Sequence, residues 1–482
     1  MKTSKIEHLL KALKTHELPL LEKFISSPYF NSKKDIILFF DFLYQNIKKD
    51  KTNFNLGTRE EAFLYIYPNT PFDNIKIIKL TSDLVNLVQQ FYVNQEIRYD
   101  NLLNKYIYID ALSSRNLDNQ FIQESNKLIS LLEASPAQDA KIHLDLYLLQ
   151  KGLHFHQGKL VSKNDLLNLT EVQKRLDTYY LLSKLQLICE VTCLQNTFEE
   201  HIEIPLSETI KELSLKYSSE SILFPLYLQN LHNIQNIKDS GSLDSLVSTF
   251  FNNLNLLSHN EQLSLFILIL NTNGMKINSG HSDGIKTQFE LYKRALENNI
   301  LIRNNRITPE SFTNIVVLAT HLNKLKWAEN FIKNNSKHLP QNIREACILF
   351  CRGKITFKQD KFEETLKLLW NCRFDQLAFD LRTKSFTIRT LFEIFNKNKS
   401  SDQYEFCMGQ ILTIEKFIRR RKNLSKTKAN SYLNFIKTTK RLLKLTSNNK
   451  LTFLEAKKIK TKISTYDNII ARSWLLEKSD II

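Results

Sequence analysis

Apolar residues return every three or four positions along most of this chain. Within residues 73–98 the series Ile77, Leu80 and Leu84 follows this spacing, and residues 165–194 carry a similar series. Such spacing places the apolar side chains on one face of an α-helix, because the helix turns once every 3.6 residues or so. The same rhythm continues to the last segment, residues 453–476. The pattern predicts helix after helix.

Glycine and proline are scarce: the 482 residues include only 9 of each. Both residues interrupt helices, so their scarcity favours helices joined by short polar turns. The longest apolar stretch, residues 263–270, spans eight positions, whereas a membrane-spanning helix needs about 18. The first residues show no signal-peptide pattern, and the six cysteines suit small apolar core positions. We therefore expect a cytoplasmic protein without disulfides.

A repeat is clearest between residues 311 and 369, where two helix–turn–helix units follow one another. Trp327 and Phe362 open the second helix of each unit and stand 35 residues apart. Tetratricopeptide repeats (TPR) have a similar period, about 34 residues, and also use an aromatic residue at this place. Gly353 stands where the TPR pattern has a small residue, and Thr365 stands where alanine is usual.

These observations predict an all-α fold, a TPR-like helical-repeat α-solenoid with an N-terminal helical cluster and C-terminal capping helices. We expect an N-terminal helical domain over residues 1–135, a TPR-like helical-repeat region over residues 136–400 and a basic C-terminal helical region over residues 401–482. Pro136 marks the first boundary. In a solenoid each helix pair buries its apolar face against its neighbours, and the remaining surface is free to bind a partner.

Five segments of the chain, taken together, carry a family resemblance. They are residues 24–31, 82–87, 176–185, 327–332 and 474–478. They resemble a family of uncharacterised bacterial proteins that are all-helical and contain degenerate TPR-like repeats. The resemblance extends over nearly the whole chain and implies the fold, but it implies no activity, substrate or site. TPR-like folds in general favour protein–protein scaffolding, which is an analogy from the fold alone.

The formal net charge is +17, and most of the excess lies near the C-terminus. Residues 401–482 contain 18 Lys and Arg against 7 Asp and Glu. The candidate polyanion-binding residues are Lys416, Arg419, Arg420, Arg421, Lys422, Lys437, Lys440, Arg441 and Lys444. The last four share one face of a helix, where like charges repel unless an anion meets them. Two interpretations stay open: a sequence-independent site for nucleic acid or another polyanion, and a solvated or protein-facing surface.

Candidate metal ligands have unsuitable spacing. They are Cys189 with Cys193 and His201, Cys347 with Cys351, and the histidines His143, His154 and His156. Cysteines four residues apart on a helix are ordinarily a buried apolar pair, whereas structural zinc sites use closely spaced cysteines on turns. His154 and His156 point in different directions on a helix. We expect no metal.

No motif dictates a chemistry. The chain has no phosphate-binding loop, no dinucleotide fingerprint and no serine elbow. We therefore expect no cofactor and a non-enzymatic cytosolic scaffold or adaptor that binds a protein partner through its helical-repeat surface. The alternative is sequence-independent binding of nucleic acid or another polyanion through the basic C-terminal helices. A hydrolase or transferase would need a deep pocket where ionisable residues from distant positions converge.

Overall fold

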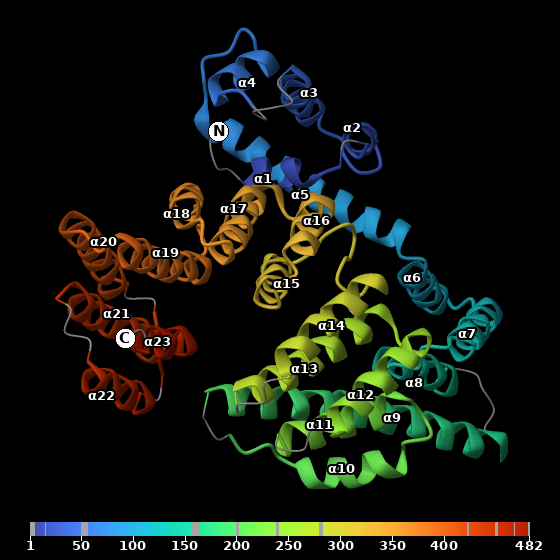
Figure 1. Ribbon diagram of the computed structural model, residues 1–482. Helices are drawn as coiled ribbons and strands as arrows, with labels where there is room; N and C mark the ends of the chain where they lie inside the picture. Colours follow the sequence, from blue (N-terminus) through green and yellow to red (C-terminus); the bar gives the residue numbers. More distant parts are fainter. Residues whose placement is uncertain are drawn as a thin grey trace. The chain divides into compact units, whose positions relative to one another are not determined.

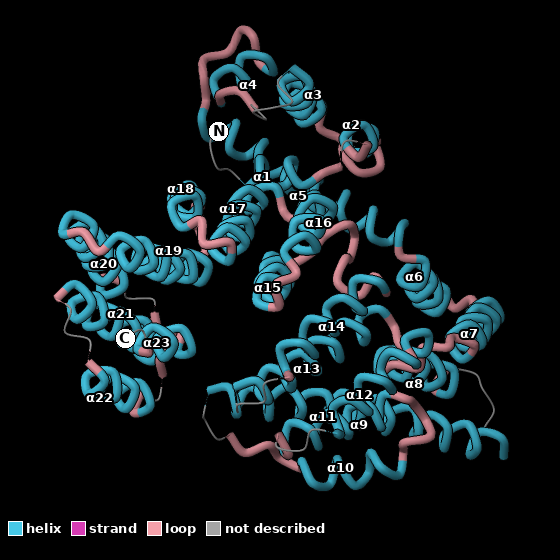
Figure 2. Tube along the Cα trace, in the orientation of Figure 1, coloured by secondary structure: helices cyan, strands magenta, loops and turns pink. Residues whose placement is uncertain are grey.

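The chain is all-helical in the computed structural model (Figure 1). The structure describes residues 5–14, 16–49, 56–156, 163–198, 202–237, 241–278, 283–421, 424–448, 452–466 and 468–480. These ranges contain twenty-three α-helices and no strand, so Figure 2 draws helices and loops only. The all-α prediction is confirmed. None of the helices in these ranges combines the length and the apolar character that crossing a membrane requires.

The chain divides into two compact units. The first unit contains residues 1–134 and 148–165, and the second contains residues 135–147 and 166–482. The helices of the first unit are α1 (Lys5–Ala12), α2 (Leu18–Ser26), α3 (Lys34–Lys49), α4 (Arg59–Ile66), α5 (Asn74–Tyr99), α6 (Asn101–Ser113) and α7 (Asp118–Glu133). Both α8 (Ala140–His154) and α9 (Lys163–Phe198) contribute residues to each unit. The division into three regions at residues 135 and 400 stays a prediction.

The second unit contains the remaining helices. They are α10 (Ser207–Lys216), α11 (Leu223–Gln235), α12 (Gly241–Asn252), α13 (His259–Asn278), α14 (Gly284–Glu297), α15 (Pro309–His321), α16 (Leu325–Asn335), α17 (Gln341–Lys358), α18 (Phe362–Asn371), α19 (Leu377–Asn398), α20 (Ser401–Arg419), α21 (Lys426–Ser447), α22 (Phe453–Ser464) and α23 (Arg472–Ser479).

The first unit has a core of its own, formed by α1 to α5. Phe39 of α3, Phe63 of α4 and Phe91 of α5 are almost fully buried in it. A capping box begins α4: the Thr58 hydroxyl accepts a hydrogen bond from the Glu61 amide (3.2 Å), and the Glu61 carboxylate accepts one from the Thr58 amide (2.8 Å). Two amide groups that a helix start leaves without partners are thereby satisfied.

In the second unit, helices pack mainly against neighbours in the sequence. α13 contacts α14, α15 contacts α16 and α17, and α17 contacts α18. One continuous apolar core extends from α9 to α19, with Phe266, Phe312 and Phe350 almost fully buried. Thr365 is also buried, and its hydroxyl lies 2.8 Å from the Thr356 hydroxyl. The position where the TPR pattern has alanine is therefore filled by a satisfied hydroxyl pair.

Short turns with a left-handed residue connect several of these helices. Asn323 follows α15 with a φ of 59°, and Asp360 follows α17 with a φ of 58°. In both turns the next amide returns to a carbonyl five residues earlier, at 2.8 and 3.0 Å. Asn116 after α6 and Asn299 after α14 have the same geometry, with bonds of 3.0 and 2.9 Å. This is the Schellman motif, in which glycine usually takes the left-handed position and asparagine replaces it at small cost.

The prediction of one last helix over residues 453–476 is wrong, because two helices, α22 and α23, occupy this region. Ala471 has a φ of 52°, and the Arg472 guanidinium donates to the Ile463 carbonyl at the end of α22 (2.9 Å). The reversal brings Trp474 against Phe392 of α19, with ring centroids 5.3 Å apart. Burial of the indole outweighs the helical propensity of the connecting residues.

The left-handed turn after α15 gives a testable prediction. Asn323→Ala is expected to lower the free energy of unfolding by about 1 kcal/mol, because alanine pays the steric cost of a positive φ. Asn323→Gly is expected to be neutral or stabilising. Urea unfolding followed by circular dichroism measures both changes, and Lys326→Ala, an exposed substitution within α16, is the control. Equal stability of the alanine and glycine variants would contradict the assignment of this turn.

Candidate functional site

Six of the nine candidate basic residues lie on two neighbouring helices, α20 and α21, which contact each other. The last turn of α20 carries Lys416 and Arg419, and Arg420 and Arg421 follow it. The four others, Lys437, Lys440, Arg441 and Lys444, lie on α21. Lys422 lies outside the described residues.

Acidic side chains of the same region neutralise three of these cations. Glu415 of α20 accepts hydrogen bonds from Arg419 (2.7 Å) and from Lys440 of α21 (2.6 Å). Burial opposes ionisation of Glu415, but the bonds from Lys440 and Arg419 prevail and lower the pKa of its carboxyl group. Glu455 of α22 bonds Arg441 at 2.8 Å. The anions that relieve repulsion on this face of α21 therefore come from α20 and α22.

The basic face that stays open to solvent is smaller than the sequence indicates. Lys416, Arg420, Lys437 and Lys444 are exposed, and none of them forms an ion pair with another described residue. Arg421 is exposed and lies 4.4 Å from the centroid of the Phe417 ring. Four cations on two helices are sufficient for contacts with phosphates, but not for recognition of bases.

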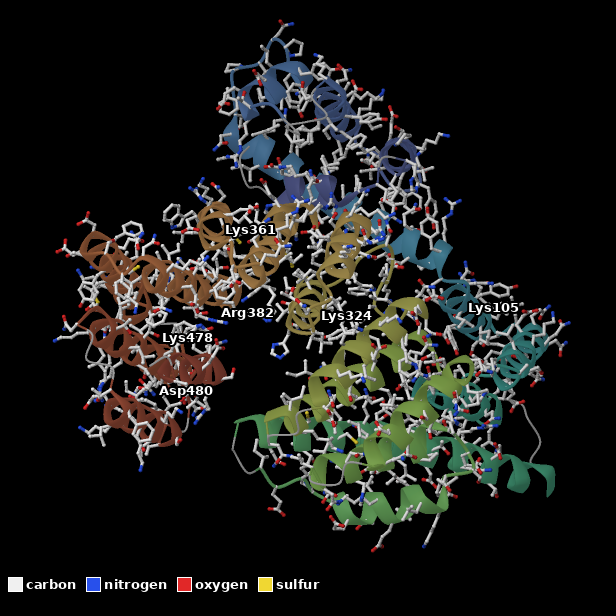
Figure 3. The ribbon with its side chains drawn as sticks, viewed as in Figure 1. Lys105, Lys324, Lys361, Arg382, Lys478 and Asp480 are labelled. Atoms are coloured by element: carbon white, nitrogen blue, oxygen red, sulfur yellow. The ribbon has the colours of Figure 1, made fainter. Side chains whose placement is uncertain are left out.

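A second candidate site is a cavity in the second unit. It has a volume of about 500 Å³ and lies between α15, α17, α19 and α23. This volume falls within the range of small-molecule sites, about 300–1,000 Å³. Figure 3 labels Lys478 of α23, which lines the cavity, and Arg382 of α19, whose guanidinium donates to the Asn314 side chain of α15 (3.0 Å).

On one side of this cavity, charges are paired. Glu393 of α19 is buried and accepts hydrogen bonds from the Trp474 indole (3.0 Å) and from Lys478 (2.9 Å). Lys478 also contacts Glu477 at 3.0 Å. Burial lowers the pKa of Lys478, but its bonds to these two carboxylates outweigh burial and leave the pKa above its ordinary value.

The other side of the cavity holds a lysine without such a partner. The Lys354 ammonium lies 3.4 Å from the centroid of the Phe386 ring and 5.1 Å from that of Phe350. No described carboxylate forms an ion pair with it. Burial places the pKa of Lys354 well below its ordinary value, and the neighbouring cations Arg389 and Arg382 lower it further. An aromatic ring beside an ammonium stabilises it by about 0.5–2 kcal/mol, which offsets only part of the free energy lost when the ammonium leaves water.

Arg389 completes the basic side of the cavity. Its guanidinium carbon lies 6.0 Å from the centroid of the same Phe386 ring, 5.5 Å from that of Phe357 and 5.4 Å from that of Trp474. Its Nε atom is buried and has no hydrogen-bond partner in the part of the chain that the structure describes. Burial lowers the pKa of Arg389, while the nearby carboxylates Glu393 and Glu477 oppose that change. Lysine and arginine are donors only, so this side of the cavity is suited to an acceptor with negative charge.

Sequence reasoning missed this cavity. Lys354 interrupts the apolar face of its helix between Phe350 and Phe357, and Arg382 and Arg389 stand seven residues apart on one face of α19. A charged residue on an otherwise apolar helix face is a usable signal. The convergence of α17, α19 and α23 depends on tertiary packing, which this signal does not contain. A pocket with converging ionisable residues is also what an enzymatic alternative requires.

None of the described cysteine and histidine candidates for metal binding lines this cavity. All six cysteines are free thiols and buried. Burial raises the pKa of Cys347 to about 12 and that of Cys372 to about 11, which disfavours the thiolate that metals bind. His201 lies outside the described residues. Within the described ranges no three His, Cys, Asp or Glu residues gather in a metal-binding group.

His143 on α8 is the histidine with the most unusual surroundings. It is buried, and neither ring nitrogen has a hydrogen-bond partner within the described ranges. Burial lowers its pKa to about 4, and the Arg175 charge acts in the same direction, whereas Asp139 and Glu220 oppose it. The folded protein therefore holds this imidazole neutral.

Because His143 is buried and neutral, we expect the free energy of unfolding to depend on pH. Above the unfolded-state pKa, about 6.5, both states hold His143 neutral and it contributes no pH dependence. As the pH falls from about 6.5 to 4 the unfolded state binds the proton first, so up to about 3 kcal/mol of stability is lost. His143→Leu is expected to flatten this part of the stability–pH curve, measured by urea unfolding, whereas substitution of the exposed His8 by Gln is not. An unchanged slope in the His143 variant would refute the assignment.

No family model and no curated protein matches this chain. The resemblance to TPR-like bacterial proteins therefore stays a prediction, and the function must be argued from the surfaces of the molecule.

Proposed function

We propose that the protein is a non-enzymatic scaffold whose TPR-like helical hairpins bind a protein partner. Two features support the repeat. The α15–α16 and α17–α18 hairpins close through equivalent left-handed residues, Asn323 and Asp360, and α15 packs directly on α17. Trp327 is partly buried against the core, and its ring lies edge-to-face with Phe289 of α14, with centroids 4.9 Å apart. Equivalent hairpins in contact are the unit from which helical-repeat surfaces are built.

The observation that carries the proposal is an exposed aromatic pair formed by one residue of α18 and one of α20. Trp370 at the end of α18 is 52% exposed, and Phe406 of α20 is 44% exposed. Their ring centroids are 6.3 Å apart in an edge-to-face arrangement. Single exposed apolar residues are normal, but a tryptophan beside a second aromatic ring is the composition of interface hot spots. Exposed charged residues such as Lys367 and Glu405 border the pair, as in the polar rim of an interface.

Replacing both rings tests this function. The full-length protein and its Trp370→Ala/Phe406→Ala variant serve as baits, and proteins retained by the first alone are identified and purified. We expect at least a tenfold loss of affinity in the double variant, because hot-spot aromatics contribute about 2 kcal/mol or more each. Phe453→Ala, on an exposed residue of α22, is the control. The proposal fails if no protein prefers the unmodified surface, or if the purified partner binds the double variant equally well.

Binding of nucleic acid or another polyanion is the second candidate function. It is favoured by Lys416, Arg420, Lys437 and Lys444, four candidate cations on or directly after α20 and on α21 that are exposed and lack acidic partners among the described residues. Contacts with phosphates would be independent of sequence and would weaken with salt.

A salt series distinguishes this candidate. If RNA or DNA binds, Lys437→Glu/Lys444→Glu is expected to reduce the slope of log affinity against log salt concentration by about 2. Lys326→Glu/Lys333→Glu makes the same change of charge on exposed residues of α16 and serves as the control. Absence of binding at low salt, or an equal effect of both double variants, removes this function.

A further inference from the structure

The cavity between α15, α17, α19 and α23 contains an imbalance that the packing of the helices does not explain. Lys478 contacts both Glu393 and Glu477, whereas Lys354 contacts aromatic rings and repelling arginines. An ammonium withdrawn from bulk water without an acid is costly, and proteins ordinarily replace it by an apolar residue or supply a carboxylate. Methionine would fill a similar volume on this face of α17 at no such cost.

We propose that this cavity binds a small molecule that carries an oxyanion, a carboxylate or a phosphate, on an apolar body. Lys354 and Arg389 are the donors to the oxyanion. This site is separate from the aromatic pair of the proposed protein interface, since neither Trp370 nor Phe406 lines the cavity.

Two independent observations place an acceptor at this end of the cavity. The first is the ammonium of Lys354, which lines the cavity and has no ion pair with the described residues. The second is Arg389, which also lines the cavity and whose buried Nε has no hydrogen-bond partner among the described residues. Both cations lie beside the Phe386 ring, so one oxyanion located next to that ring would approach both. Charge-assisted hydrogen bonds of this kind are the strong ones, and they gain from the low dielectric of a cavity.

The rest of the cavity selects against other ligands. The rings of Phe357, Phe386 and Trp474 form apolar walls, which suit a hydrocarbon or aromatic body. The carboxylates of Glu393 and Glu477 are occupied by Lys478, and Glu393 also accepts the indole N–H of Trp474. A cationic ligand would therefore meet Lys354 and Arg389, and two of the three carboxylates that line the cavity, Glu393 and Glu477, already contact Lys478.

Binding of the oxyanion should be coupled to proton uptake by Lys354. Lys354 faces Arg382 and Arg389 of α19 and Cys351 of its own helix, and the cavity also receives His321 from α15 and Glu477 and Lys478 from α23. Burial and the two arginines lower the pKa of Lys354, and an incoming oxyanion raises it, so binding takes up a proton at any pH between these two values. Arginine stays protonated at all accessible pH values. The Lys354→Arg variant is therefore expected to bind the oxyanion without taking up a proton.

The test uses the full chain and four probes of similar shape: phenylacetate, phenyl phosphate, phenylacetamide and phenethylamine. At 10 mM we expect the first two to raise the midpoint of thermal unfolding by roughly 2 °C and the neutral and cationic probes to leave it unchanged. The relative effect of the carboxylate and the phosphate identifies the class of natural ligand. A response to all four probes, or to none, overturns the proposal.

Substitutions of Lys354 and Arg389 test whether these two donors cause the shift in the midpoint of thermal unfolding. Lys354→Met and Arg389→Gln are each expected to abolish the shift, whereas Lys354→Arg retains it and Lys333→Met, on an exposed residue of α16, does not alter it. Calorimetry in buffers of different ionisation heat should show proton uptake for the natural chain and none for Lys354→Arg. The proposal is overturned if Lys354→Met, shown by circular dichroism to be folded, still responds to the oxyanions. If it does not fold, the failure of Lys354→Arg to respond serves the same purpose.

Discussion

The α15–α16 and α17–α18 hairpins bury the apolar faces of their helices against each other because the chain reverses within three residues in each hairpin. Left-handed residues, Asn323 and Asp360, provide these two reversals, and a third, Asn299, ends α14. The short asparagine or aspartate side chain tolerates a positive φ far better than branched or bulky residues do. A chain with few glycines can therefore still make tight turns, and the core from α9 to α19 depends on them.

Sequence periodicity locates helices well where a single apolar face decides the packing. Residues 73–98 were expected to be helical, and α5 covers Asn74–Tyr99. The pattern fails where tertiary packing overrides it, as in residues 453–476, where the burial of Trp474 requires a reversal. Nothing in the spacing of Ile463 and Trp474 distinguishes one helix from two, because both arrangements place them in the same core.

The candidate sites show the same limit. The basic residues of α20 and α21 are readable in the sequence, but Glu415 and Glu455 act on them across helices, from positions that linear spacing does not reveal. Two of the lysines that line the cavity, Lys354 and Lys478, show this limit most clearly. Both line the same space, yet carboxylates raise the pKa of Lys478 while burial and arginines lower that of Lys354. Environment, rather than residue type, determines what each can do.

The position of α23 in the chain bears on when the cavity can form during folding. Most helix contacts of the second unit join neighbours in the chain, so they can form while the polypeptide still emerges from the ribosome. The bond between the Trp474 indole and Glu393 joins residues 81 positions apart and must wait for α23. The wall that α23 contributes is thus assembled after the helices that precede it, and the cavity is complete only once α23 has been translated.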